Sequence, residues 1–155
     1  MDKRDAQMLT LLQADATIGL NELAKAVNLS PTPCWRRLQK LRDEGVICRQ
    51  VVLCDPNKLN LGLTAFVTVR SNQHGDAWTK RFIDAVREIP EIIEIHRLSG
   101  DVDYLLKVVV PDIAGYDRVY KRLIKSVELM DVSSAFAMEV IKRTTALPLD
   151  YVVSE

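Results

Sequence analysis

The apolar residues of this chain change their spacing near residue 60, and that change constrains the fold more than any other feature of the sequence. Up to about residue 50 they recur every three or four positions, as along Leu20, Leu23, Ala24 and Val27, which is typical of amphipathic helices. From residue 63 they alternate within short runs rich in β-formers, which is typical of strands. The sequence therefore predicts a helical N-terminal domain followed by a mixed domain.

Two consecutive helices are predicted between residues 20 and 44, and the second has a sharp start. Asn28 can end the first helix because asparagine tolerates the left-handed conformation. Ser30 is a natural N-cap residue, and Pro31 and Pro33 fall in the first turn, where N–H groups have no intrahelical partner. The second helix is expected to end near residue 44, just before Gly45. Its predicted buried face consists of Cys34, Leu38 and Leu41.

The other face of the second helix is basic. Four basic residues and no acidic residue lie between Ser30 and Arg42 inclusive. Such a helix pair is typical of a helix-turn-helix, whose second helix enters the major groove of DNA with its N-terminal part foremost. Arg37 and Arg42 are expected to reach the phosphate backbone, and the alternatives are a solvated basic face and Trp35 packed against a partner chain. The candidate DNA-binding residues are Ser30, Thr32, Pro33, Trp35, Arg36, Arg37 and Lys40.

After residue 62 the predicted order of elements is strand, helix, strand, strand, helix, strand. This βαββαβ order is that of a ferredoxin-like domain, a four-stranded antiparallel sheet with both helices on one face. The bare face of such a sheet, with apolar residues alternating along its strands, is expected to be covered by another subunit. The strands are expected at 63–70, 92–98, 104–110 and 132–141, and the helices at 76–89 and 112–127.

The predicted fold class is therefore α+β, with four segments. Residues 1–50 form a helix-turn-helix (winged-helix-like) DNA-binding domain, and residues 51–62 a hinge strand or linker, since the stretch 46–55 is rich in β-formers. Residues 63–142 form the ferredoxin-like domain and residues 143–155 a C-terminal tail. The net charge is zero, so one basic helix is not expected to hold DNA alone, and a dimer presenting two helices is predicted.

Three stretches resemble the family of leucine-responsive and asparagine-synthesis regulators, Lrp/AsnC. They are "LNELAKAVNLSPTPCWRRLQKLRDEGVI", "LSGDVDYLLKV" (98–108) and "SSAFAMEVIKRTTALPL" (133–149), and they occur in the family's order and spacing. The resemblance covers nearly the whole chain. It implies a bacterial or archaeal transcription regulator with a helix-turn-helix, a hinge strand and an effector-sensing βαββαβ domain. It also implies dimers joined through their sheets, often four dimers in a ring.

The resemblance further implies an amino-acid effector bound between neighbouring sensing domains, near the loop 99–103. Gly100 would let a ligand carboxylate approach backbone N–H groups, and Asp101 or Asp103 could pair with the ligand's ammonium. On the residues alone the alternative is an ordinary hairpin connection, because Gly-Asp is common turn chemistry. The candidate effector-binding residues are Leu98, Ser99, Gly100, Asp101, Val102, Asp103, Tyr104, Ser133 and Ser134.

The cysteines leave one alternative function open, and the sequence offers no catalytic motif. Cys34, Cys48 and Cys54 have no zinc-like spacing and are most simply small buried hydrophobes, but they leave a redox- or metal-sensing regulator as the alternative function. No serine-histidine-acid set or phosphate-binding glycine loop is evident, so no enzyme activity is predicted. No metal or cofactor is predicted either, and the only expected small-molecule ligand is the amino-acid effector. The N-terminus lacks a signal-peptide pattern and no apolar run reaches a membrane-spanning length, which predicts a cytoplasmic protein without a membrane partner.

Overall fold

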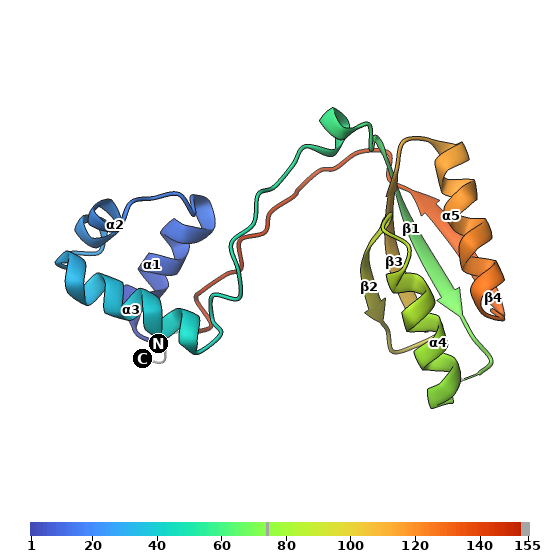
Figure 1. Cartoon of the computed structure of the whole chain (residues 1–155), viewed down its shortest axis with the longest axis horizontal. Helices are drawn as coiled ribbons and strands as arrows, with labels where there is room; N and C mark the ends of the chain where they lie inside the picture. Colours follow the sequence, from blue (N-terminus) through green and yellow to red (C-terminus); the bar gives the residue numbers. More distant parts are fainter. Residues whose placement is uncertain (74, 153–155) are drawn as a thin grey trace. The chain divides into compact units, whose positions relative to one another are not determined.

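The computed structural model of the chain describes residues 1–73 and 75–152, and it confirms the α+β class (Figure 1). The chain divides into two compact units. The helical unit contains residues 1–52 and the C-terminal segment from Lys142, and the sheet unit contains Leu53–Ile141. Within the described residues, no helix is both long and apolar enough to cross a membrane.

The helical unit contains α1 (Lys3–Ala14), α2 (Leu20–Ala26) and α3 (Pro31–Asp43). Asn28, between α2 and α3, has the predicted left-handed conformation with φ of +53°, and Gly45, which follows α3 as expected, also has a positive φ of +72°. Ser30 is the N-cap of α3, but its side chain makes no capping hydrogen bond. Pro33 explains this in part, because the third helical residue normally supplies one of the N–H donors for a capping side chain.

The core of the helical unit is small, and α3 contributes to it as expected. Cys34 is fully buried against Met8 of α1 and Leu23 of α2, and Leu38 packs at the edge of the same cluster. Leu41 is also buried. The predicted inner face of α3 is therefore confirmed.

The C-terminal segment belongs to this unit through a contact with α1. The Gln13 side-chain amide donates to the backbone carbonyl of Leu147 (3.1 Å) and accepts from the Leu147 N–H (2.7 Å). One side chain thus satisfies both backbone groups of a residue that has no strand partner in its own unit. The tail expected at 143–155 is fastened to the helical unit at this point.

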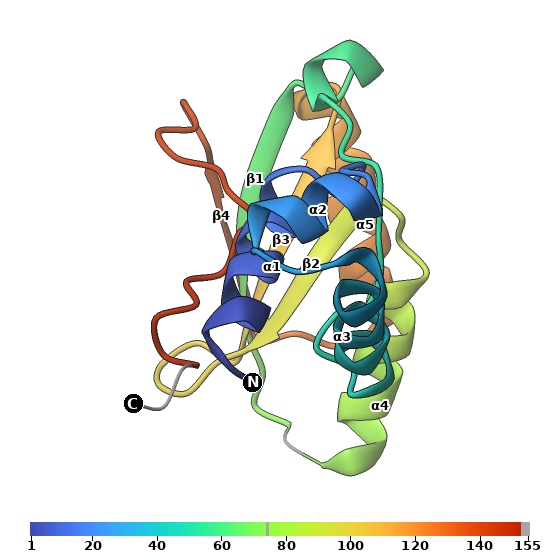
Figure 2. The ribbon, with the colours of Figure 1, turned by 90° about the vertical axis from the view of Figure 1, so that its left-hand side faces the viewer.

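The sheet unit has the predicted βαββαβ order. It contains β1 (Leu63–Arg70), α4 (Asp76–Arg87), β2 (Ile92–Arg97), β3 (Tyr104–Val110), α5 (Ile113–Ser126) and β4 (Asp131–Phe136), preceded by a 3-10 turn (Pro56–Leu59). The strand order is β2-β3-β1-β4, and every neighbouring pair is antiparallel. Both helices lie on one side of the sheet (Figure 2).

Two predicted strands differ from the structure for one physical reason. The final strand ends at Phe136 instead of residue 141, and among the described residues no strand lies within 46–55. Phe136 pairs with Ala65 near the start of β1, so β4 soon runs beyond the strand that could pair with it. Extended segments without a neighbouring strand form no ladder, whatever their β propensity.

The core of the sheet unit lies between the sheet and the two helices. Phe82 of α4 is fully buried, with its ring centroid 5.3 Å from Trp78 and 4.6 Å from Tyr104 of β3. Val119 and Leu123 of α5 are buried in the same cluster. Packing of Tyr104 in this core fixes the beginning of β3, and with it the C-terminal end of the loop 98–103 that precedes the strand.

Candidate DNA interface and effector loop

The outward face of α3 presents an aromatic and two basic side chains together. Trp35 is 50% exposed, Arg36 is exposed, and the Lys40 side chain is 69% exposed. Ser30, Thr32 and Pro33 are exposed at the start of the helix. The structure thus leaves six of the seven candidate DNA-binding residues accessible on one helix, without a capping or core role for their side chains.

The seventh candidate, Arg37, makes ion pairs within the chain. Its Nη1 donates to Asp2 Oδ2 (2.6 Å) and to Asp5 Oδ1 (2.8 Å), both at the start of α1. The backbone N–H of Asp5 and the Arg37 guanidinium lower the pKa of Asp2 to about 2. Arg37 therefore ties α3 to α1, and its expected phosphate contact competes with these two carboxylates.

The neighbouring basic residues Arg36 and Lys40 make fewer ion pairs within the chain than Arg37 does. Among residues 1–73 and 75–152, no carboxylate lies within ion-pair distance of Arg36, and Lys40 has only an exposed pair with Glu44 at 3.7 Å. Exposed pairs of this kind contribute little, so Lys40 can exchange Glu44 for a phosphate at small cost. Charge on this face is thus available to an external anion.

The two acids that pair with Arg37 were not predicted from the sequence, although a local signal was present. Asp2 caps α1 and forms a capping box with Asp5, in which each side chain accepts from the other residue's backbone N–H. An acid three residues after an N-cap acid is the spacing of that motif. The motif locates a helix start, but nothing in the spacing indicates that an arginine of a later helix reaches it.

The candidate effector loop, residues 98–103, joins β2 to β3 and is fixed near its C-terminal end. The Leu98 N–H donates to the Asp103 carbonyl (2.8 Å), and the Asp103 N–H donates to the Val69 carbonyl (3.0 Å). The Asp103 carboxylate accepts from the Ser71 N–H at 2.7 Å. Sequence analysis missed Ser71, which follows β1. Asp103 therefore has a loop-fixing role, in addition to the ammonium contact considered from the sequence.

The tip of the loop is open. Gly100 has φ of +118°, and a Cβ built there would meet no atom within 4 Å. The positive φ of Gly100 thus favours glycine, whereas the space around it within one chain would accommodate a larger side chain. Ser99 and Asp101 are exposed, Leu98 is 41% exposed and Val102 is half-buried. Tyr104 differs from them because it is 4% exposed and packs in the aromatic core.

The two candidate serines of β4 point to opposite faces of the sheet. The Ser134 hydroxyl hydrogen-bonds the Tyr116 hydroxyl of α5 and so faces the helices. The Ser133 hydroxyl donates to Asp131 on the bare face (3.1 Å). Ser133 pairs with Thr68 of β1, and Thr68 pairs with Leu105 of β3, so β1 lies between Ser133 and the loop strand. Within one chain, the loop and Ser133 share an end of the sheet but lie on different strands.

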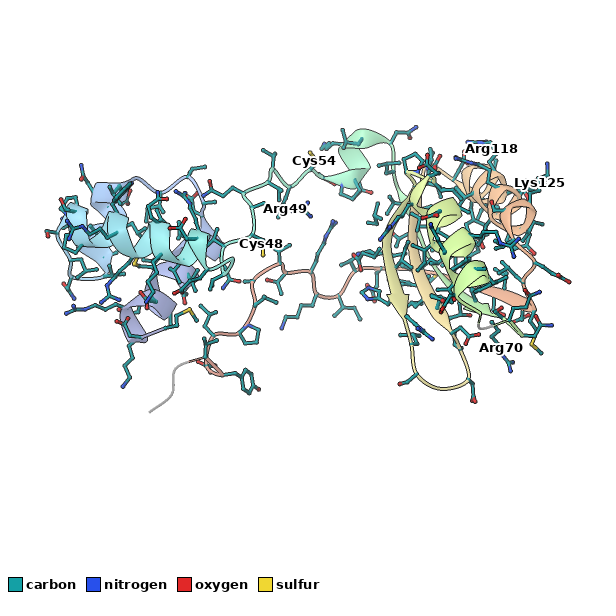
Figure 3. The ribbon with its side chains drawn as sticks, turned by 60° about the horizontal axis from the view of Figure 1, so that its bottom comes forward. Cys48, Arg49, Cys54, Arg70, Arg118 and Lys125 are labelled. Atoms are coloured by element: carbon teal, nitrogen blue, oxygen red, sulfur yellow. The ribbon has the colours of Figure 1, made fainter. Side chains whose placement is uncertain are left out.

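The cysteines give no support to a sensing role. Cys34 is fully buried, and burial raises the pKa of its thiol, which disfavours the reactive thiolate. Cys48 and Cys54 are exposed on extended segments (Figure 3), so the expectation that the cysteines are small buried hydrophobes is correct for Cys34 and wrong for the other two. In the part of the chain that the structure describes, no group of three or more histidine, cysteine or acidic side chains could hold a metal ion.

Comparison with known proteins identifies both units. Residues 1–47 match the model of a winged helix-turn-helix DNA-binding domain, and residues 64–147 match the Lrp/AsnC ligand binding domain. The DNA-binding transcriptional activator DecR of Escherichia coli is 50% identical over 97% of this chain and 99% of its own length.

Two solved structures resemble the whole chain. An AsnC family transcriptional regulator from Agrobacterium tumefaciens is 57% identical with a TM-score of 0.95, covering 99% of this chain and 100% of its own. A transcriptional regulator from Neisseria meningitidis, solved as a complex with L-Met, is 36% identical with a TM-score of 0.93, covering 99% of each chain. The chain therefore belongs to the Lrp/AsnC family of helix-turn-helix transcriptional regulators, and it is not an enzyme.

Proposed function

We propose that this regulator binds double-stranded DNA through the exposed face of α3. The observation that carries the proposal is the contrast on that helix between Arg37, which is held by two acids, and Arg36, which has no carboxylate within ion-pair distance in the described residues. An accessible arginine on a recognition helix can contact guanine or phosphate. The proposed DNA contacts come from Ser30, Thr32, Pro33, Trp35, Arg36 and Lys40, and Arg37 contributes mainly by holding α3 in place.

We propose a homodimer as the binding unit, with four dimers forming the larger assembly that the family resemblance implies. The bare sheet face carries Phe66, 39% exposed, and the half-buried Leu105 and Val109 of the neighbouring strand β3, on either side of Lys107, which pairs with Phe66. The unpaired segments near the ends of the sheet unit expose further apolar side chains, including Met138 (96%) and Ile141 (90%). Apolar residues on unpaired strands and a bare sheet favour burial against a second chain.

We propose that the effector is a free amino acid and that it binds at the loop 98–103. The loop offers exposed backbone at Gly100 and an exposed acid at Asp101, which suit a carboxylate and an ammonium respectively. The Neisseria relative, solved with L-Met, supports an amino acid as the ligand class. Because β1 separates the loop from Ser133 of the same chain, we place Ser133 of a neighbouring chain among the further contacts.

The proposed role places the protein in the cytoplasm, with DNA, an amino acid and further copies of itself as its partners. A thermal-shift screen against the twenty amino acids tests the effector, because a ligand that binds the native state raises the melting temperature by mass action. DNA titration with and without the best amino acid then tests the coupling, and light scattering at micromolar concentration tests the assembly. If no amino acid raises the melting temperature or changes the DNA affinity, the proposed effector is wrong. If the protein binds DNA as a monomer, the proposed dimer is wrong.

A further inference from the structure

The N-terminal ends of α2 and α3 frame a small recess, and two of the proposed DNA contacts, Thr32 and Trp35, line it. It has a volume of about 200 Å³ and is lined by Leu20, Pro31, Thr32 and Trp35. Leu20 is the first residue of α2, and the other three lie in the first two turns of α3. The recess therefore opens at the part of a helix-turn-helix that lies nearest the bases.

Trp35 is exposed in a way that the fold of one chain does not explain. Half of its surface remains accessible, whereas the chain's other tryptophan, Trp78, is 4% exposed and donates its indole N–H to the Glu128 carbonyl. Among the described residues, no hydrogen bond is formed by the Trp35 indole N–H. A large aromatic left in water forgoes much of the free energy that its burial would supply. An external apolar group against Trp35 would recover it.

The chemistry of the recess selects among the groups that a major groove offers. Leucine, proline and tryptophan present carbon surface, and Thr32 adds a methyl beside its hydroxyl. Guanine, adenine and cytosine present hydrogen-bond donors and acceptors in the major groove, whereas thymine also presents a methyl group. Arg36, the next residue, supplies the charge that a guanine or a phosphate would need.

We infer that this recess, with Trp35 as its main wall, binds the 5-methyl group of a thymine in each half-site of the operator. The inference rests on the proposed placement of α3 in the major groove and adds the base that α3 reads there. Trp35 is then a specificity-determining residue, and Arg36 supplies a separate polar contact. Each dimer would contact one such methyl per recognition helix.

Uracil substitution tests the methyl alone. DNA is first selected by the wild-type protein from a random-sequence library, and each thymine of the selected site is then replaced by deoxyuridine, which lacks only the methyl. Replacement of thymine at one symmetric pair of positions should weaken binding by about fourfold for each methyl removed, which is the effect of losing one buried carbon group. The absence of a penalty at every position would overturn the inference, whereas failure to select any DNA would overturn the proposed function itself.

Variants of Trp35 test whether the loss of affinity on uracil substitution arises at the recess. In Trp35→Ala, thymine and uracil sites should bind equally, and Trp35→Phe should keep part of the difference because it keeps an apolar ring. Arg36→Ala is the matched control, since it should weaken binding to both sites while preserving the fourfold ratio. A full uracil penalty in Trp35→Ala would overturn the assignment.

Fluorescence quenching supplies an independent measurement. The chain has two tryptophans, and only Trp35 is accessible to acrylamide in the described structure. Selected DNA should therefore protect most of the quenchable emission. If that emission is already protected without DNA, Trp35 packs against protein and the inference fails.

Discussion

Helix α3 and the loop 98–103 are both exposed, but they differ in how much of a binding site one chain provides. The exposed side chains of α3 stand together on one helix, and the buried Cys34 and Leu41 hold that helix in place. The loop has fixed ends, yet its tip faces open space at Gly100, and Ser133 lies beyond β1. Each protomer thus carries all the proposed DNA contacts of one half-site, and a dimer presents two such sets, whereas the proposed effector site needs residues of two chains even to form once.

The way each element is held differs as well. α3 packs in a core with few buried side chains and is reinforced at the surface by the Arg37 ion pairs. The loop precedes Tyr104, which packs against Phe82 in the larger aromatic core. Perturbing each element therefore requires different substitutions.

The largest expected effect comes from the core behind the loop. Phe82→Ala removes a fully buried ring that contacts both Trp78 and Tyr104, so the free energy of unfolding of the sheet unit should fall by about 3–5 kcal/mol. Urea denaturation followed by circular dichroism measures the change. Ile113→Ala is the control, because Ile113 is 58% exposed and its truncation should change stability by about 0.5 kcal/mol at most. Equal effects of the two variants would contradict the assigned core.

The next effect concerns the DNA surface. Arg36→Ala should weaken binding to selected DNA by about 1–3 kcal/mol for each lost base contact, and Lys40→Ala should flatten the salt dependence if Lys40 contacts phosphate. Neither should change thermal stability, because both side chains are exposed. Lys121→Ala removes the same charge from the sheet unit, where Lys121 pairs with Asp117, and should leave affinity unchanged. Unaltered affinity in both α3 variants would refute the recognition-helix assignment.

Arg37→Ala should show the opposite pattern, with a larger effect on stability than on sequence preference. Loss of its contact with the largely buried Asp5 should lower the stability of the helical unit by about 1 kcal/mol at neutral pH. Thermal denaturation compared with Arg36→Ala measures the difference. If Arg37→Ala is as stable as wild type but fails to bind DNA, Arg37 is a DNA contact and the comparison between the two arginines is wrong.

The pH dependence of this pair has a defined sign. The pKa of Asp2 is about 2 in the folded protein and close to 3.8 when unperturbed, so the unfolded state binds the proton more readily. The stabilisation is therefore fully present above pH 4 and is lost as the pH falls toward 2. The stability difference between wild type and Arg37→Ala should shrink over that interval, and a constant difference would show that Asp2 does not respond to Arg37.

The sequence predicted what depends on neighbours along the chain. Helix starts and ends follow from Asn28, the prolines and Gly45, and the βαββαβ order follows from alternation, because these signals are local. It did not predict that Arg37 pairs with Asp2 and Asp5, since that contact joins residues more than thirty positions apart. The predicted end of the last strand was wrong for a similar reason, because the end of β4 depends on where its partner strand β1 begins.

The candidate effector residues show the same limit. Gly100 and the exposed loop tip agree with the sequence interpretation, but Tyr104 is in the core and Ser134 faces α5. Alternation along β4 indicates that consecutive serines point to opposite faces, yet only the packing of α5 decides which face Ser134 meets. The resemblance to the family suggested the loop as a candidate effector site, whereas the residues alone favoured an ordinary hairpin connection.

The smallest expected effect on DNA binding, and the one that separates the two regions most sharply, comes from Asp103. Asp103→Ala removes the acceptor of the Ser71 N–H, whereas Asp103→Asn keeps an oxygen acceptor there and removes the charge. If the loop acts only through the effector, both variants should keep basal affinity for selected DNA within about threefold of wild type, or roughly 0.65 kcal/mol.

The effector's influence on DNA affinity should nevertheless shrink, because coupling requires that the amino acid binds two states of the protein differently. Calorimetry with the best amino acid from the screen, followed by DNA titration with and without it, measures both quantities. A response lost in Asp103→Ala and kept in Asp103→Asn would assign Asp103 to fixing the loop, and a response lost in both would assign its charge to the ligand's ammonium. If both variants bind the amino acid as wild type does, with the same effect on DNA affinity, the effector site lies elsewhere in the protein.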